Sequence, residues 1–186
     1  MIMSNKILIA SDLHGDAECT EKLLLRFREE EATLCVLLGD LLYHGPRNDL
    51  PKGYAPKRVI ELLNGVRDQL LCVRGNCDTE VDQMVLNFPI LSETAVLFVD
   101  QRRWYLTHGH HYSVENPLPL QKGDLQLSGH THVPIAVPFG EGNVALNPGS
   151  TSIPKENSPK SYLVYENGTF YWKNLEDGMV YKTFSL

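Results

Sequence analysis

Short apolar runs alternate with amphipathic stretches in the first half of the chain. The runs at 6–10, 33–38 and 69–73 are apolar and partly β-branched, which predicts buried strands. Between them, residues 17–30 and 56–64 place apolar side chains at helical spacing, which predicts two helices. Strands that alternate with helices in this way favour a mostly parallel sheet with right-handed crossover connections.

A β pattern dominates the second half of the chain, where short apolar runs are separated by turn residues. Asn167-Gly168 is the clearest of these turns, because this dipeptide favours a tight hairpin. The elements predicted from residue 79 onward are a short helix at 79–86 and strands at 94–99, 103–107, 125–127, 134–139, 143–146, 162–166, 169–173 and 179–184. The sequence has no repeat and no linker, so we expect one domain over residues 1–186.

The composition narrows the class of protein. The chain has a net charge of −6 and no Lys/Arg cluster, so a nucleic-acid partner is not expected. None of the four cysteines forms a CxxC motif, and Cys35 and Cys72 are expected to be buried thiols in a reducing compartment. The first ten residues are too short for a signal peptide, and no apolar run reaches membrane-spanning length. We therefore expect a cytoplasmic protein with no membrane partner.

Side chains that can bind metals follow five of the predicted strands. They are Asp12, His14, Asp40, Asn76, His108, His130 and His132. Because ligands in α/β sheets gather beyond the carboxyl ends of the strands, we expect these side chains to lie together. Two carboxylates, one carboxamide and four imidazoles are too many for one ion and suit two ions, with Asp40 as the natural bridge. Nitrogen and oxygen ligands without a thiolate favour Mn²⁺, Fe²⁺, Zn²⁺ or Ni²⁺ over Ca²⁺ or Mg²⁺.

Five short motifs, in order along the chain, resemble the signature motifs of the calcineurin-like metallophosphoesterases. They are Asp12-x-His14, Gly39-Asp40, Gly75-Asn76-x-Asp78, His108-Gly109 and Gly129-His130-x-His132. Segments 44–48, 74–78 and 147–150 resemble the small bacterial phosphodiesterases of this superfamily. The resemblance covers residues 6 to about 155. It implies an α/β (α+β) fold, a four-layer α/β/β/α sandwich in which two packed mixed β-sheets are flanked by helices.

The same resemblance implies two divalent metal ions per chain, with Mn²⁺ as the first choice and Ni²⁺, Zn²⁺ or Fe²⁺ as alternatives. The implied ligands are Asp12, His14, Asp40 and His132 for one ion, and Asp40, Asn76, His108 and His130 for the other. Of these, Asp40, Asn76 and His108 are also expected to be catalytic. The implied reaction is attack of a hydroxide that bridges the two ions on a small phosphodiester.

Cys77 is the one departure from the family pattern that affects the chemistry. Most of the superfamily has Gly-Asn-His-Asp in the third motif, where the histidine is thought to bind the phosphate or protonate the leaving oxygen; here that position is Cys77. A thiol cannot replace an imidazolium as a general acid near neutral pH. We therefore expect phosphodiesterase activity with weak or no phosphomonoesterase activity, and Cys77 in the leaving-group pocket.

The loop at 41–55 supplies two further predicted substrate contacts, His44 and Arg47. Long loops rich in Gly and Pro are often functional, and a cation close to the metals can bind the substrate phosphate. A solvated loop charge is an equally good interpretation of Arg47.

Arg74 and His110 complete the predicted substrate contacts. Arg74 either positions the turn at Asn76 or pairs with a nearby carboxylate such as Asp78. His110 is either close to the phosphate or an ordinary surface or core histidine. In the same way, the segment 147–150 is either a structural turn or part of the site.

Two other functions compete with a phosphodiesterase that acts on small esters. One is a non-catalytic protein-binding scaffold of the same fold, as in a retromer subunit that has lost part of the metal set. The other is a nuclease, which the acidic charge disfavours. The exposed hairpins of the second half allow a homo-oligomer, a dimer or a tetramer.

Overall fold

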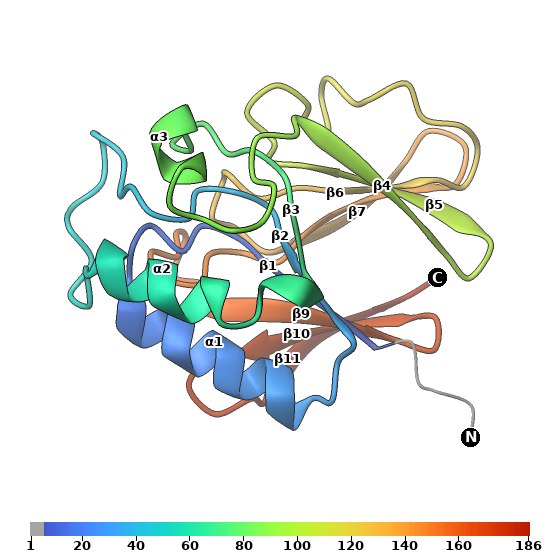
Figure 1. Ribbon diagram of the computed structural model, residues 1–186. Helices are drawn as coiled ribbons and strands as arrows, with labels where there is room; N and C mark the ends of the chain where they lie inside the picture. The colour runs from blue at the N-terminus through green and yellow to red at the C-terminus, as the bar shows by residue number, and fades with distance from the viewer. Residues whose placement is uncertain (1–5) are drawn as a thin grey trace.

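Two β-sheets packed face to face form the centre of the computed structural model, which describes residues 6–186 (Figure 1). The first sheet has the spatial order β11 (Val180–Ser185), β10 (Thr169–Asn174), β9 (Ser161–Glu166), β1 (Ile7–Ala10), β2 (Leu34–Leu37) and β3 (Leu70–Cys72). The second has the order β4 (Thr94–Val99), β5 (Arg102–Thr107), β6 (Leu125–Leu127), β8 (Asn143–Asn147) and β7 (Ile135–Phe139). Each sheet combines parallel and antiparallel pairs, so the predicted pair of mixed sheets is confirmed.

Two helices cover the outer face of the first sheet, α1 (Ala17–Glu29) and α2 (Pro56–Asn64). The helix α1 begins where the Asp16 carboxylate accepts a hydrogen bond from the backbone N–H of Cys19 at 3.0 Å, which is an N-cap. The helix α2 begins at Pro56, a residue whose fixed φ suits the first helical turn. Both helices were predicted from their apolar spacing.

Two short helical segments differ from the predictions. A single 3₁₀ turn at Arg67–Gln69 precedes β3 and was not predicted. The helix α3 (Glu80–Gln83) starts at the Thr79 capping box but ends earlier than expected. Its last side chain, Gln83, donates to the carbonyls of Leu86 and Phe88, which turns the chain away from the helix axis.

The alternation of side chains along β1 creates two separate cores. Leu8 and Ala10 face the helices, whereas Ile7 and Ile9 face the second sheet. Aromatic rings fill the space between the sheets, where Trp104 meets Tyr165 edge to face with ring centroids 4.6 Å apart. A continuous apolar layer therefore lies between the sheets, and buried hydrogen bonds such as that from Trp172 Nε1 to the carbonyl of Asn147 supplement it.

An irregular segment, rather than a helix, covers the outer face of the second sheet. Within the described part of the chain, no helix is assigned between β5 and β6. The segment is tied to Gln126 of β6, which donates to the carbonyl of Ser113 and accepts from the N–H of Leu118. Pro117 and Pro119 lie in this segment, and each disrupts a helix interior. The sandwich is confirmed, with its fourth layer built from a loop.

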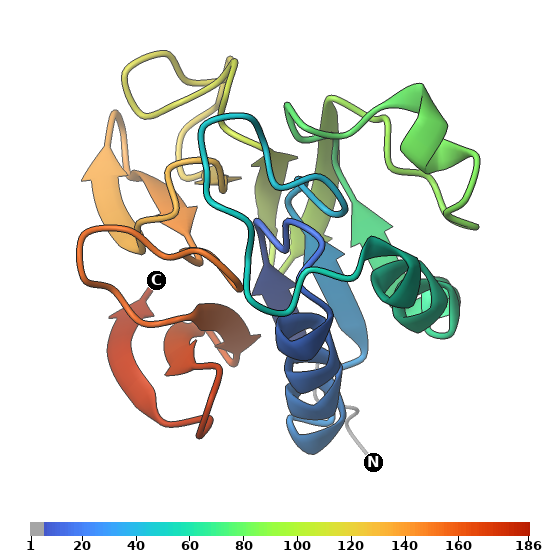
Figure 2. The ribbon, with the colours of Figure 1, turned by 90° about the vertical axis from the view of Figure 1, so that its left-hand side faces the viewer.

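The parallel strands of both sheets end at one side of the molecule. In Figure 2 the loop after β1 lies beside the loop at 41–55. Backbone hydrogen bonds join these loops, since the N–H of His14 donates to the carbonyl of Asp40 at 2.9 Å. The two sheets meet here as well, because the N–H of His130 donates to Asp12 Oδ2 at 3.0 Å.

Candidate metal centre

The predicted ligands converge where the strand ends of the two sheets meet. They are Asp12, His14, Asp40 and Asn76 from the first sheet and His108, His130 and His132 from the second. The Nε2 of His132 lies 3.1 Å from Asp12 Oδ1 and 3.2 Å from His14 Nε2. The cluster buries both carboxylates and three of the four imidazoles, while Asn76 stays exposed.

Asp40 lies between two groups of ligands. Its Oδ2 is 3.8 Å from the Nε2 of His14 and 3.4 Å from the Nε2 of His108. The His108 Nε2 is in turn 3.2 Å from Asn76 Oδ1 and 3.3 Å from His130 Nδ1. Asp40 therefore stands between His14 on one side and His108 on the other, within one cluster of candidate ligands.

Three imidazoles are oriented by backbone carbonyls. The Nδ1–H groups of His14, His108 and His132 donate to the carbonyls of Tyr43, Leu38 and Ile153 at 2.8, 2.6 and 2.7 Å. A carbonyl can only accept, so each Nδ1 carries a proton, and Nε2 presents a lone pair to the centre whenever the ring is neutral. This is the arrangement that second-shell partners impose on metal-binding histidines.

The polar atoms at the centre fit a cation. Asp12 Oδ1 is buried without a hydrogen bond of acceptable geometry, although His132 Nε2 is only 3.1 Å away. The Nε2 atoms of His14 and His132 face each other at 3.2 Å, and in the neutral rings both are lone pairs. A buried carboxylate oxygen and two opposed lone pairs are stabilised by a positive ion between them. The residues present therefore fit the metal set that the motifs predict.

The electrostatics of the centre point the same way. Burial opposes ionisation of Asp12, but the neighbouring imidazoles of His132 and His14 hold its pKa well below the usual range. Burial also opposes protonation of His108, yet contact with Asp40 and the charges of both carboxylates raise its pKa to about 9. The buried carboxylates remain ionised and produce a negative field that attracts cations.

The backbone at the ligands is strained. Asp12, His14, Asp40, His130 and His132 all have left-handed φ angles, between 47° and 66°. Such conformations are unfavourable for residues other than glycine and cost about 1 kcal/mol or more each, so they persist where function requires them. Nothing in the local sequence pattern indicates them.

Asp78 supports the centre without being a ligand. Its carboxylate accepts hydrogen bonds from the backbone N–H groups of Asp40, Leu41 and Gly75 at 2.8, 2.9 and 2.8 Å. Arg74 pairs with nearby carboxylates, as one interpretation of the sequence suggested, but the Asp78 carboxylate is not among them. Arg74 donates instead to the Asp78 carbonyl, and its guanidinium faces Glu80 and Glu93. In the sequence, the supporting role of Asp78 was indicated only by its position as the last residue of the third motif.

A cavity of about 360 Å³ opens over the ligands. Its lining residues are His14, Asp40, Gly45, Pro46, Arg47, Asn48, Asn76, Cys77, His130, Thr131, His132 and Lys155. Two of the predicted substrate contacts, Arg47 and Cys77, are among them. Lys155 was missed by the sequence analysis, because it lies in a different loop more than 100 residues from Arg47 and carries no motif.

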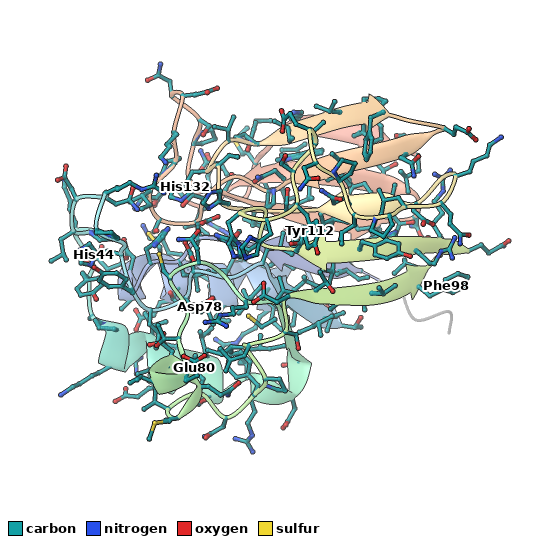
Figure 3. The ribbon with its side chains drawn as sticks, turned by 90° about the horizontal axis from the view of Figure 1, so that it is seen from above. His44, Asp78, Glu80, Phe98, Tyr112 and His132 are labelled. Carbon is teal, nitrogen blue, oxygen red and sulfur yellow. The ribbon has the colours of Figure 1, made fainter. Side chains whose placement is uncertain are left out.

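The other predicted substrate contacts lie outside this lining. His44 packs against the rings of Tyr43 and Tyr54, and Figure 3 shows it farther from the strands than His132. His110 is close to the centre, with its ring centroid 5.4 Å from that of His108. Arg74 is half-buried among acidic side chains.

The segment 147–150 has a clear structural role. Asn147 Nδ2 donates to the carbonyl of Gly129 at 2.6 Å, which holds the loop that carries two of the histidines. Ser150 Oγ and Ser152 Oγ both donate to the carbonyl of Asp12, at 3.0 and 2.8 Å. These bonds fix the positions of two ligand loops relative to each other.

The sandwich fold and the cluster of candidate ligands at the strand ends indicate the class of protein. The chain belongs to the calcineurin-like phosphoesterase superfamily, whose domain model matches residues 6–169. It is similar to phosphodiesterase YfcE of Escherichia coli strain K12, with 48% identity over 162 residues, which are 87% of this chain and 88% of YfcE. The solved structure of the E. coli phosphoesterase YfcE matches with a TM-score of 0.93 and 44% identity, covering 97% of this chain and 98% of that one.

A more distant structural likeness shows the fold alone. Entamoeba histolytica Vps29 in complex with zinc has a TM-score of 0.60 and 20% identity, covering 97% of this chain and 98% of Vps29. Within residues 6–186, no helix is long and apolar enough to cross a membrane.

Proposed function

We propose that this chain is a phosphodiesterase that holds two divalent metal ions, Mn²⁺ in first place with Ni²⁺, Zn²⁺ and Fe²⁺ as alternatives, and acts on small phosphodiesters. The observation that carries this proposal is the position of Asp40, whose carboxylate lies between His14 and His108. One carboxylate shared by two ligand sets suits a bridge between two ions. The 48% identity with E. coli phosphodiesterase YfcE supports the diesterase activity.

The proposed ligands are Asp12, His14, Asp40 and His132 for one ion, and Asp40, Asn76, His108 and His130 for the other. When bound, such ions supply a nucleophile at neutral pH and neutralise the charge on the phosphate. Asp40, Asn76 and His108 are the proposed catalytic residues, because Asp40 is common to both sets, His108 lies next to it, and Asn76 contacts His108. The carbonyl of Leu38 keeps the His108 ring in place during the reaction.

Arg47 and Lys155 are the proposed contacts to the phosphate oxygens. Both are exposed cations that line the cavity over the ligands, and charge-assisted hydrogen bonds to phosphate are among the stronger polar contacts. His44, Arg74 and His110 do not line this cavity, so we assign them no direct contact with the reacting phosphate.

Cys77 lines the same cavity and sets the preference for diesters in this proposal. Its Sγ is 3.2 Å from Asn76 Nδ2, in the position where most of the family has a histidine. A neutral thiol gives little help to a poor leaving group. Substrates with good leaving groups should therefore react faster than alkyl monoesters.

The scaffold and nuclease alternatives are less well supported. A scaffold does not need a full ligand set, whereas this chain has all seven ligands in contact with one another. A net charge of −6 disfavours a nuclease that tracks the nucleic-acid backbone. We further propose a cytoplasmic protein, consistent with its four free buried cysteines, and a dimer or tetramer as its assembly.

The test is hydrolysis of a chromogenic phosphodiester and its matching monoester by metal-stripped protein with Mn²⁺, Ni²⁺, Zn²⁺ or Mg²⁺ added back. We expect metal-dependent diesterase activity, weak monoesterase activity and two bound ions per chain by elemental analysis. If the protein hydrolyses neither ester with any of the metals, whether or not it binds them, the scaffold function is favoured.

A further inference from the structure

A second cavity, of about 590 Å³, opens beside the cavity over the metal ligands. The two share Arg47, Asn48 and Lys155, so a molecule that fills the first can continue into the second. The loops that form the second cavity face each other in Figure 2. We call this second cavity the basic groove, and its lining residues are Asp16, Arg47, Asn48, Asp49, Leu50, Pro51, Lys52, Ser152, Ile153, Pro154, Lys155 and Lys160.

The basic groove is positively charged although the chain as a whole is acidic. Arg47, Lys52 and Lys155 are exposed, and within the described chain none of their three side chains forms an ion pair or a hydrogen bond. Lys160 is half-buried and lies 3.8 Å from the Asp16 carboxylate, so these two charges largely offset each other. Three free cations therefore face the single remaining carboxylate, that of Asp49.

A phosphodiester has two ester arms, and only one of them can leave in a given reaction. Cys77 borders the metal cavity but not the basic groove, whereas Arg47 and Lys155 border both. An arm that passes between Arg47 and Lys155 reaches Lys52, which lines the groove but not the metal cavity. Lysine is a mobile point charge that suits a terminal phosphate dianion.

We propose that the basic groove binds a second phosphate group carried on the non-leaving arm of the diester. The inference rests on the proposed diesterase function and specifies its substrate class: diesters with a terminal phosphate monoester on one alcohol. Lys52 is the specificity-determining residue for that phosphate, and Lys155 connects the two sites.

The experiment uses two chromogenic substrates that share the reacting group and the leaving group. One is the 4-nitrophenyl ester of thymidine 5′-phosphate, and the other is the same ester with a 3′-phosphate. In the metal-loaded protein we expect kcat/KM to be about tenfold higher for the 3′-phosphorylated substrate at low ionic strength. The ratio should fall towards one in Lys52→Gln and as salt is added, because screening weakens exposed charge pairs. Lys122→Gln, at an exposed cation in the turn before β6, is the matched control and should keep the wild-type ratio.

The outcomes separate the two proposals. Hydrolysis of neither substrate would overturn the diesterase function itself. Hydrolysis of both with equal kcat/KM, unchanged by Lys52→Gln, would overturn the basic groove alone. An equal gain in kcat/KM from an analogue with a singly charged 3′-carboxylate would show that the groove accepts any anionic arm. This result would contradict the assigned substrate class, diesters with a terminal phosphate.

Discussion

Asp78 fixes the backbone that carries Asp40, although it lies outside the ligand set. Three backbone N–H groups converge on this one buried carboxylate, including those of Asp40 and Gly75. A carboxylate accepts at both oxygens, whereas an amide must also place an NH₂ group. The contribution of this residue is therefore positional.

Asp78→Asn should lower both stability and metal affinity. One amide nitrogen would face a backbone N–H donor, so we expect a loss of about 2–3 kcal/mol in the free energy of unfolding. Displacement of Asp40 should weaken metal binding about 10–100-fold, as loss of outer-shell partners does elsewhere. Urea unfolding of metal-stripped protein and metal titration measure the two effects. Asp68→Asn, at an exposed carboxylate, is the control, and equal behaviour of both variants would contradict the role of Asp78.

Cys77→His should raise phosphomonoesterase activity relative to diesterase activity. An imidazolium can protonate a poor leaving oxygen, so the ratio of monoester to diester kcat/KM should increase by about tenfold or more. Cys77→Ser keeps a small neutral side chain and should retain the original ratio. An unchanged ratio in Cys77→His would sink the argument from the third motif.

At the scale of elements, the site requires that the loops after β2 and β3 lie in close contact. A Cβ atom on Gly75 would lie 2.1 Å from Asp40 Oδ1 and 2.3 Å from the Asp40 backbone nitrogen. A backbone atom cannot move aside as a flexible side chain can. Glycine is therefore needed for the loop after β3 to contact the loop after β2.

Gly75→Ala should separate these loops and disrupt the shared carboxylate. We expect a loss of about 3 kcal/mol in the free energy of unfolding, because the backbone must shift. Chemical denaturation measures this change, and loss of metal-dependent activity should accompany it. Gly65→Ala is the control, since its Cβ would come no closer than 3.3 Å to any atom, the carbonyl oxygens of Leu62 and Glu61 being the nearest, and its φ is −66°. Wild-type stability in Gly75→Ala would refute the steric argument.

The metal centre joins the two sheets at the scale of the whole molecule. Asp12 belongs to the first sheet and His132 to the second, and they are 120 positions apart in sequence. The apolar layer between the sheets supplies most of the cohesion, and a cation bound by the candidate ligands would add attraction at one end only. A ligand that binds only the folded state stabilises it by mass action.

Removal of metal should therefore lower the thermal midpoint. At a metal concentration of about 100 times Kd the stabilisation is about 2.7 kcal/mol. For a chain of this size that corresponds to a rise in Tm of about 5–10 °C. Scanning fluorimetry of stripped and reloaded protein measures the shift. His132→Gln should lose most of it, and His111→Gln, with an exposed side chain, should keep it. An equal shift in both variants would mean that the metal binds elsewhere.

The sequence by itself determined most of the strand and helix pattern and the set of candidate metal ligands. Apolar periodicity reports which face of an element is buried, and the motifs place Asp12, Asp40 and His132 directly after strands. The helix α3 is shorter than the pattern predicted, because the Gln83 side chain donates hydrogen bonds to carbonyls just beyond it. Helix propensity does not report such a contact.

Only the tertiary structure decided which side chains surround the cavity over the candidate metal ligands. Arg47 and Lys155 come from loops more than 100 residues apart, and His44 turned towards two tyrosine rings instead of the metal ligands. The left-handed backbone at Asp40 likewise has no local signal. Long-range packing sets these features, since a loop residue takes its direction from whatever the rest of the fold places against it.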